Sequence, residues 1–144
     1  VGGKLPATDP AAVQRAEQAL EALSSEFRGW LAEEVTKLEA AWAAARKAGL
    51  VGDAGEALFT VAHDLRGLGT TYEFPIISRM SASLSRLIED DEKRAEMPVS
   101  LVDAHVNAIV AALRQNIRSE ENPVGKALAD ELEQQVIALV GEPN

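Results

Sequence analysis

Apolar residues recur at steps of three, four or seven along the first third of the chain, a spacing that collects them on one face of an α-helix. The stripe consists of Val13, Leu20, Leu23, Phe27, Leu31, Val35, Leu38 and Trp42. Asp9-Pro10 is typical of a helix start, an N-cap followed by proline in the first turn. We therefore predict a loose tail over residues 1–9 and a long helix to about Lys47, with Gly29 as a candidate kink or break.

The same spacing continues in shorter segments that are separated by turn-forming or charged residues. We expect helices over about 53–73, 75–88, 100–117 and 124–141. Asp53 is a candidate N-cap for the first of these, with Glu56 as its capping-box partner. The charged run 89–94 is expected to be a loop, and Asn122-Pro123 to separate the last two helices.

The pattern contains no convincing strand and no internal repeat. It predicts an all-α fold, an up-down four-helix bundle with an additional N-terminal helix. Within this arrangement, residues 1–28 are expected to form a tail and helical extension, and residues 29–144 the bundle domain. The composition agrees, because 47% of the residues are hydrophobic but only 4% are aromatic, which suits closely packed helices better than a sheet.

The formal net charge of −9 argues against a nucleic-acid partner and an anionic membrane surface, both of which need a positive field. No apolar run approaches the ~20 residues of a membrane span, and no signal peptide is visible. The chain has no cysteine, which excludes disulfides and thiolate chemistry. We expect a cytoplasmic protein without membrane or nucleic-acid partners.

The predicted helix over residues 53–73 carries one of the two histidines of the chain. Its apolar residues share one face and are Leu58, Val61, Leu65, Leu68 and Tyr72. At about 100° per residue, His63 projects roughly opposite this face, into solvent. Near the same exposed line lie Glu56, Phe59, Gly67 and Thr70, with Arg66 at its edge.

Gly67 and Gly69, which follow His63 in this helix, each cost about 1 kcal/mol relative to alanine. Gly69 lies on the flank of the apolar face, where close packing against another helix explains it. Gly67 removes a side chain from the solvent face one turn after His63, so another surface can approach the imidazole there. His105 lies at the edge of another apolar face without a neighbouring glycine or arginine, and we expect it to be a boundary histidine with a structural hydrogen bond.

The run from His63 to Tyr72 resembles the histidine phosphotransfer (HPt) domains of bacterial multistep phosphorelays, whose signature is roughly His-x-Leu-Lys-Gly followed by small residues and a bulky apolar one. The matching residues are His63, Leu65, Arg66 in the lysine position, Gly67, Gly69, Thr70, Thr71 and Tyr72. Arg66 keeps the positive charge of the lysine but presents a different donor geometry. Glu73 stands where many family members have glycine, a difference that concerns the end of the helix.

The resemblance implies that His63 accepts a phosphoryl group on its Nε2 atom, from a receiver-domain aspartate or a kinase, and passes it to a response regulator. Arg66 and Thr70 are the expected phosphate-stabilising residues, because both can donate hydrogen bonds to phosphoryl oxygens. The residues expected to dock the partner are Glu56, Phe59 and Gly67.

The expected partners are response regulator receiver domains and a sensor or hybrid histidine kinase. The Mg²⁺ for such a transfer would be held by carboxylates of the receiver, so we expect no intrinsic cofactor and no metal site in this chain. A Gly-rich nucleotide-binding motif is also missing, which favours a phosphotransfer intermediate over an autonomous kinase. We expect a monomer, with a dimer through the N-terminal helix as the alternative.

Two other interpretations stay open. Residues 63–66 match the start of the His-Glu-Leu-Arg-Thr-Pro box of sensor-kinase dimerisation and phosphotransfer segments, although Gly67-Leu68 replaces its Thr-Pro pair. The chain also fits a helical interaction module without phosphate chemistry, given its long amphipathic N-terminal helix. A metal-binding bundle would need Glu three residues before each histidine, where this chain has Thr60 and Val102.

Overall fold

The computed structural model describes residues 9–143, and these are all-helical, with no strand among them. The elements are α1 (Pro10–Ala48), α2 (Gly52–Thr71), α3 (Pro75–Leu87), the short 3₁₀ helix η1 (Arg94–Glu96), α4 (Val99–Arg114) and α5 (Pro123–Val140). This confirms the predicted all-α class. Apart from Asp9, the expected loose tail lies outside the described residues.

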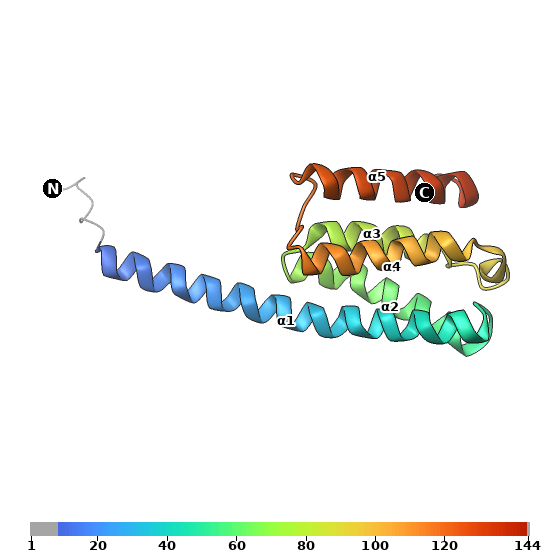
Figure 1. The fold of residues 1–144 in the computed structure, drawn as a ribbon, viewed down its shortest axis with the longest axis horizontal. Helices are drawn as coiled ribbons and strands as arrows, with labels where there is room; N and C mark the ends of the chain where they lie inside the picture. Colours follow the sequence, from blue (N-terminus) through green and yellow to red (C-terminus); the bar gives the residue numbers. More distant parts are fainter. Residues whose placement is uncertain (1–8, 144) are drawn as a thin grey trace.

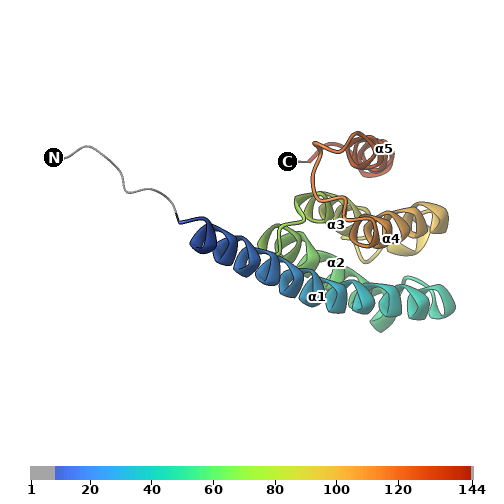
Figure 2. The same cartoon turned by 60° about the vertical axis from the view of Figure 1, so that its left-hand side comes forward.

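Successive α-helices run in alternating directions and are joined by short connections (Figure 1). The C-terminal half of α1 packs against α2 and α4, and α3 packs against α2 and α4 in turn. The core lies between these helices and includes Ala129, Leu132 and Val136 of α5. The last helix, α5, packs on the outer side of α3 and α4 (Figure 2). The pairing of α2 with α3 is the most extensive, and it positions the candidate site.

Helix α1 continues through Gly29 without a break. Its N-cap is Asp9, whose carboxylate accepts a hydrogen bond from the backbone N–H of Ala11, as expected. The first fully buried side chain of α1 is Leu31. Just before Leu31, Phe27 and Trp30 pack against Tyr72, which follows α2. The N-terminal end of α1 projects away from the other helices (Figure 1).

The start of α5 confirms the predicted helix boundary, whereas the start of α2 and the end of α4 differ from the prediction. Asn122 caps α5 by accepting hydrogen bonds from two backbone N–H groups. The predicted capping box of α2 is wrong, because the helix starts at Gly52 after Val51, which makes no side-chain capping bond. The fourth helix ends earlier than predicted, at Arg114, since Asn116 adopts a left-handed backbone with φ of 56°.

The charged run after α3 is not a plain loop, because it leads into η1 and buries Arg94. The Nε atom of Arg94 donates to the carbonyl of Ile88 at 2.6 Å, and Nη2 donates to the carbonyl of Glu89 at 3.4 Å. These carbonyls lie at the end of α3, where helical partners are missing. Arg94 therefore caps α3 from a segment that was expected to be a loop.

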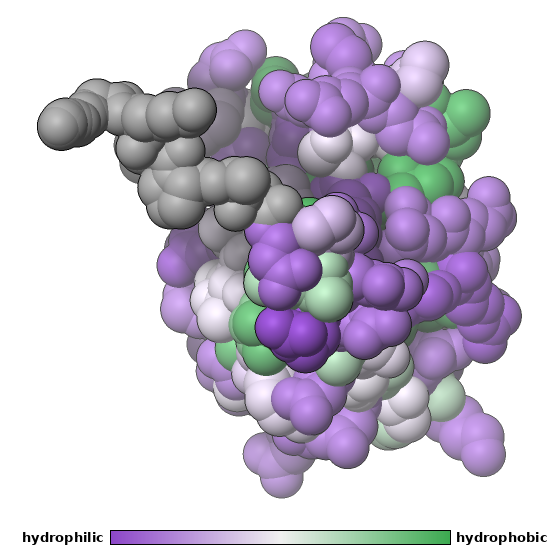
Figure 3. Space-filling view, turned by 90° about the vertical axis from the view of Figure 1, so that its left-hand side faces the viewer, coloured by the Kyte–Doolittle hydropathy of each residue, from purple (hydrophilic) through white to green (hydrophobic). Residues whose placement is uncertain are grey.

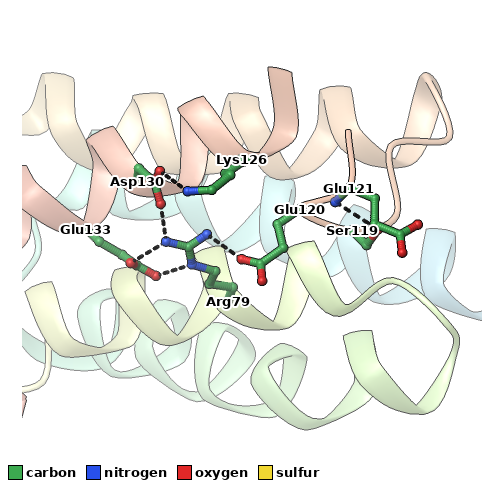
Figure 4. Close-up of polar contacts among 7 residues, drawn as sticks. All are labelled: Arg79, Ser119, Glu120, Glu121, Lys126, Asp130 and Glu133. Atoms are coloured by element: carbon green, nitrogen blue, oxygen red, sulfur yellow. Dashed lines mark hydrogen bonds and ion pairs between the residues drawn. The ribbon is translucent and has the colours of Figure 1, made fainter. Parts of the chain in front are cut away.

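An ion-pair network joins α3 to α5 (Figure 4). Arg79 of α3 forms a two-pronged contact with Glu133, at 2.6 and 2.7 Å, and reaches Asp130 at 2.5 Å. It also pairs with Glu120 at 3.2 Å. The hydrogen bond that Arg79 donates to Glu133 raises the pKa of Arg79, while hydrogen bonds from Lys126 and Arg79 lower the pKa of Asp130. The network holds the outermost helix in place.

Candidate functional site

The buried face of α2 is centred on small residues. Its buried positions are Gly55, Leu58, Ala62, Leu65 and Gly69. The predicted core residues Val61, Leu68 and Tyr72 are only half-buried. The buried face of α2 is therefore rotated about the helix axis relative to the predicted face. Alanine and glycine on this face let α3 come close to the α2 backbone, where larger side chains would keep it at a distance.

Gly69 lies at the closest approach of α2 to the start of α3. A Cβ atom at this position would lie 2.5 Å from Ser78 Oγ and 2.6 Å from the Ser78 backbone nitrogen. Ser78 Oγ also accepts hydrogen bonds from the backbone N–H and the hydroxyl of Thr70. The expected packing role of Gly69 is confirmed.

His63 lies on the outer side of α2, with 49% of its side chain exposed. Arg66, one turn further along the helix, places its Nη2 atom 3.0 Å from His63 Nε2. Because an arginine only donates hydrogen bonds, Nε2 is the acceptor and the imidazole proton sits on Nδ1. Asp64 Oδ1 is 4.0 Å from Nδ1 and faces that proton. The pair thus defines a neutral imidazole whose Nε2 lone pair points toward a cation.

Phe59 precedes His63 by one turn, and the two ring centroids are 5.8 Å apart. The sequence placed Phe59 fully outside, but the ring is half-buried and packs against the core. On its other side, the guanidinium carbon of Arg94 lies 5.6 Å from the ring centroid. Arg94 also pairs with Glu56, at 3.1 Å. Two of the three predicted docking residues are therefore anchored by the same buried arginine.

A groove of about 290 Å³ runs between α2 and α3 beside the imidazole. The α2 side contributes Phe59, Thr60, His63 and Arg66, and the α3 side contributes Ala82, Ser85, Arg86 and Glu89. Arg86 is the residue that sequence reasoning missed, since it occupies the end of a different helix. Arg66 and Arg86 line opposite walls of this groove, and the guanidinium of Arg86 donates a hydrogen bond to the carbonyl of Gly141, which follows α5.

Thr70 is not brought to His63. It lies seven residues further along α2, about 10.5 Å along the helix axis, and its hydroxyl donates to Ser78 Oγ at 2.9 Å. Gly67, in contrast, is open to solvent, and a Cβ atom there would meet nothing within 4 Å. The open surface around Gly67 continues directly from the imidazole.

The second histidine, His105, is fully buried between α3 and α4, so its predicted boundary position is wrong. Its Nδ1–H donates to the carbonyl of Leu101 at 2.8 Å, and its Nε2 accepts from the Ser83 hydroxyl at 2.9 Å. His105 thus makes the expected structural hydrogen bond and a second one in addition. Burial lowers the pKa of His105, which keeps the imidazole neutral in the core.

Comparisons of the chain with protein-family models, with curated proteins and with solved structures find no match. Within residues 9–143, no group of three or more acidic or histidine side chains could hold a metal ion. None of the helices in the same span is long and apolar enough to cross a bilayer. The function is therefore inferred from the residues around His63.

Proposed function

We propose that this chain is a histidine phosphotransfer protein, which accepts a phosphoryl group on His63 and passes it to a response regulator. The donor is the phosphorylated aspartate of a receiver domain, or a sensor or hybrid histidine kinase. The observation that carries the proposal is the half-exposed imidazole whose Nε2 atom lies 3.0 Å from the Arg66 guanidinium. A nucleophile with an adjacent cation is what transfer of a charged phosphoryl group requires.

In the proposed step, the Nε2 lone pair attacks phosphorus in line with the aspartyl oxygen. The N–P bond forms as the bond from phosphorus to the aspartyl oxygen breaks, and the aspartate leaves as a carboxylate. The imidazole keeps its proton on Nδ1, so the product is a positively charged N-phosphoimidazolium that Asp64 faces. Arg66 exchanges its contact with Nε2 for one with the phosphoryl oxygens, and the reverse reaction uses the same geometry.

The surface near His63 supports docking of a folded partner. Gly67 leaves the helix surface bare one turn beyond the imidazole, so a receiver loop can approach the backbone. Phe59 and Glu56 extend this surface on the other side and are held by Arg94. Thr70 is a weaker part of the proposal, because its hydroxyl already donates to Ser78.

The proposal includes an HPt-like four-helix bundle, in which the ring formed by α1 to α4 is the bundle and the projecting part of α1 is the additional N-terminal helical segment. It also includes a cytoplasmic location. In this proposal, carboxylates of the receiver domain bind the Mg²⁺ that the reaction needs. The chain supplies the nucleophile and its charge partner.

The test is phosphoryl uptake from receiver domains labelled with ³²P on aspartate. We expect wild-type protein to take up label that is stable in alkali and labile in acid, and His63→Gln to take up none. The matched control is His105→Gln, which removes the buried histidine and should still accept label if it folds by circular dichroism. Equal labelling of wild type and His63→Gln, or no uptake from any member of a broad receiver panel, would refute the proposal.

A second experiment distinguishes a phosphorelay intermediate from a sensor-kinase segment. Incubation of the protein alone with ATP and Mg²⁺ should give no label on His63. Efficient self-labelling would favour a sensor-kinase segment, and the phosphorelay intermediate would then be the wrong assignment.

A further inference from the structure

The groove beside His63 continues past the end of α3. A second groove, of about 630 Å³, shares Arg66 and Arg86 with the first, so the two are contiguous. The second groove is also lined by Leu139 and Val140, the last two residues of α5. One depression therefore leads from the imidazole, across the end of α3, to the end of α5.

The end of α5 presents two aliphatic side chains to this depression. Leu139 is 47% exposed and Val140 is 38% exposed. The guanidinium of Arg86 donates a hydrogen bond to the carbonyl of Gly141, which follows them directly. This bond ties the chain after α5 to the end of α3, so Leu139 and Val140 stay beside the groove.

Charge alone gives the second groove little attraction for a partner. Three basic and three acidic side chains line it, so the opposite charges balance; they are Arg66, Arg86 and Lys93, and Glu89, Asp90 and Glu142. Burial of apolar surface is the main favourable contribution to most protein associations, and arginine is enriched in interfaces. Exposed aliphatic side chains next to arginines therefore fit the surface of another folded protein.

A folded partner that covers His63 is wide enough to reach the end of α5. A standard interface of ~800 Å² per partner is a patch roughly 30 Å across. Helix α3 packs against both α2 and α5. Because packed helix axes lie about 8–10 Å apart, the axis of α5 lies within about 20 Å of the axis of α2. The bond between Arg86 and Gly141 brings the end of α5, rather than its start, to the groove.

We propose that the receiver domain that exchanges a phosphoryl group with His63 also packs apolar residues of its own surface on Leu139 and Val140. The inference rests on the proposed phosphotransfer function and adds a second contact to it. Leu139 and Val140 act in docking alone and take no part in the chemical step. The end of α5 then contributes to the choice among receivers.

The test compares wild type with the double variant Leu139→Gln/Val140→Gln. The donor is the ³²P-labelled receiver domain that labels wild type fastest in the panel, and initial rates are measured against its concentration. The half-saturating receiver concentration should rise by about tenfold, because the lost apolar contact weakens binding. The rate at saturating receiver should stay unchanged, since the variant keeps the nucleophile and Arg66. Glutamine adds no charge, so long-range repulsion is not introduced.

Val124→Gln is the matched control on the same helix. Val124 is 59% exposed and lies fifteen residues before Leu139, about 22 Å along the helix axis. It lines a separate groove that shares no residue with either groove described above. Figure 3 views the end of the bundle where α5 begins, and hydrophobic residues interrupt a mostly hydrophilic surface there. Val124→Gln should accept label with the half-saturating concentration of wild type.

A small phosphodonor separates docking from reactivity. Phosphoramidate transfers its phosphoryl group to an imidazole nitrogen, with ammonia as the leaving group, and needs no protein partner. It should label His63 at the same rate in wild type and in the double variant. Slower labelling of the double variant would mean that Leu139 and Val140 act on the imidazole through the fold, which would overturn the docking contact.

The outcomes distinguish this inference from the proposed function. Equal half-saturating concentrations for wild type and the double variant would overturn the contact at α5 and leave phosphotransfer by His63 intact. An equal rise in Val124→Gln would also overturn it, because the effect would then not be specific to the end of α5. Absence of uptake by wild type from every receiver would refute the proposed function, and the docking contact with it.

Discussion

The guanidinium of Arg66 lies 3.0 Å from the Nε2 atom of His63, and both side chains leave the same exposed side of α2. The contact joins residues three apart in one helix, so it follows from helical geometry and does not depend on the packing of other elements. It also fixes the tautomer, because Nε2 must accept. The nitrogen proposed to accept the phosphoryl group therefore contacts the group proposed to bind the phosphoryl oxygens.

Arg66→Ala should slow phosphoryl uptake by about 10- to 100-fold, because a hydrogen bond to a charged group contributes about 1.5–3 kcal/mol. Arg66→Lys should retain an intermediate rate, since it keeps the charge and loses the planar fork. The measurement is the initial rate of transfer from a phosphorylated receiver. Arg114→Ala removes an exposed arginine at the end of α4 and should leave the rate unchanged; an equal loss there would mean that net charge alone is responsible.

Replacing Gly67 and Gly69 of α2 by alanine, one at a time, should change the free energy of unfolding in opposite directions. Gly67→Ala should stabilise the protein by about 1 kcal/mol, because the position is open and alanine is the better helix former. Gly69→Ala should destabilise it by about 1–3 kcal/mol, because the new methyl group would press on the backbone of Ser78. Urea unfolding of the pair measures both changes, and equal signs would contradict the close approach at Gly69.

Enlarging Gly67 should separate docking from stability. Gly67→Gln puts a long side chain onto the open surface one turn beyond His63, so receiver binding and phosphoryl uptake should fall while the urea midpoint stays at or above the wild-type value. Unchanged uptake by a folded Gly67→Gln protein would show that the partner approaches His63 from another side.

His105 should make stability depend on pH. Burial lowers its pKa from the ordinary value of 6.5, so below pH 6.5 the unfolded chain binds a proton that the folded chain refuses. The free energy of unfolding is therefore complete above this pH and decreases as the pH falls, by at most about 1.4 kcal/mol per pH unit, until the lowered pKa is reached. Urea unfolding between pH 7.5 and 5 should show this slope in wild type and a shallower one in His105→Gln.

Arg79→Met should loosen α5 while the packing of α1 to α4 on one another stays intact. The substitution leaves three carboxylates on or near α5 without their shared cation, so amide hydrogen exchange in α5 should accelerate by roughly tenfold and exchange in α2 should not. Lys126→Ala is the matched control, because it removes only an exposed pair with Asp130. Equal acceleration in α2 and α5 would mean that the network stabilises the whole fold rather than the outer helix.

Much of the fold follows from local sequence signals. Asp9, Pro75 and Asn122-Pro123 begin helices where capping and proline geometry require it, and Gly141 follows the last helix. The exposed position of His63 is equally local, since 100° per residue determines which side chains oppose the apolar face. The contact between Arg66 and His63 is also local, because both residues lie in one helix.

The errors arose where segments distant in sequence meet. Arg94 is an ordinary surface residue by composition, but it is buried because the end of α3 offers carbonyls that need a donor. The phosphate-stabilising role of Thr70 stays a prediction, and its hydroxyl donates to Ser78 of the next helix, a contact that the sequence did not predict. The spacing of apolar residues within one helix cannot predict either contact.

The sequence by itself determined the helices, most of their ends, the outward direction of His63 and its arginine neighbour, because these depend on spacing along one chain segment. Tertiary structure alone decided which face of α2 is buried, the burial of His105, and the arrival of Arg86 beside the imidazole. Those outcomes depend on how closely two backbones approach, which is set by pairs such as Gly69 and Ser78 on different helices.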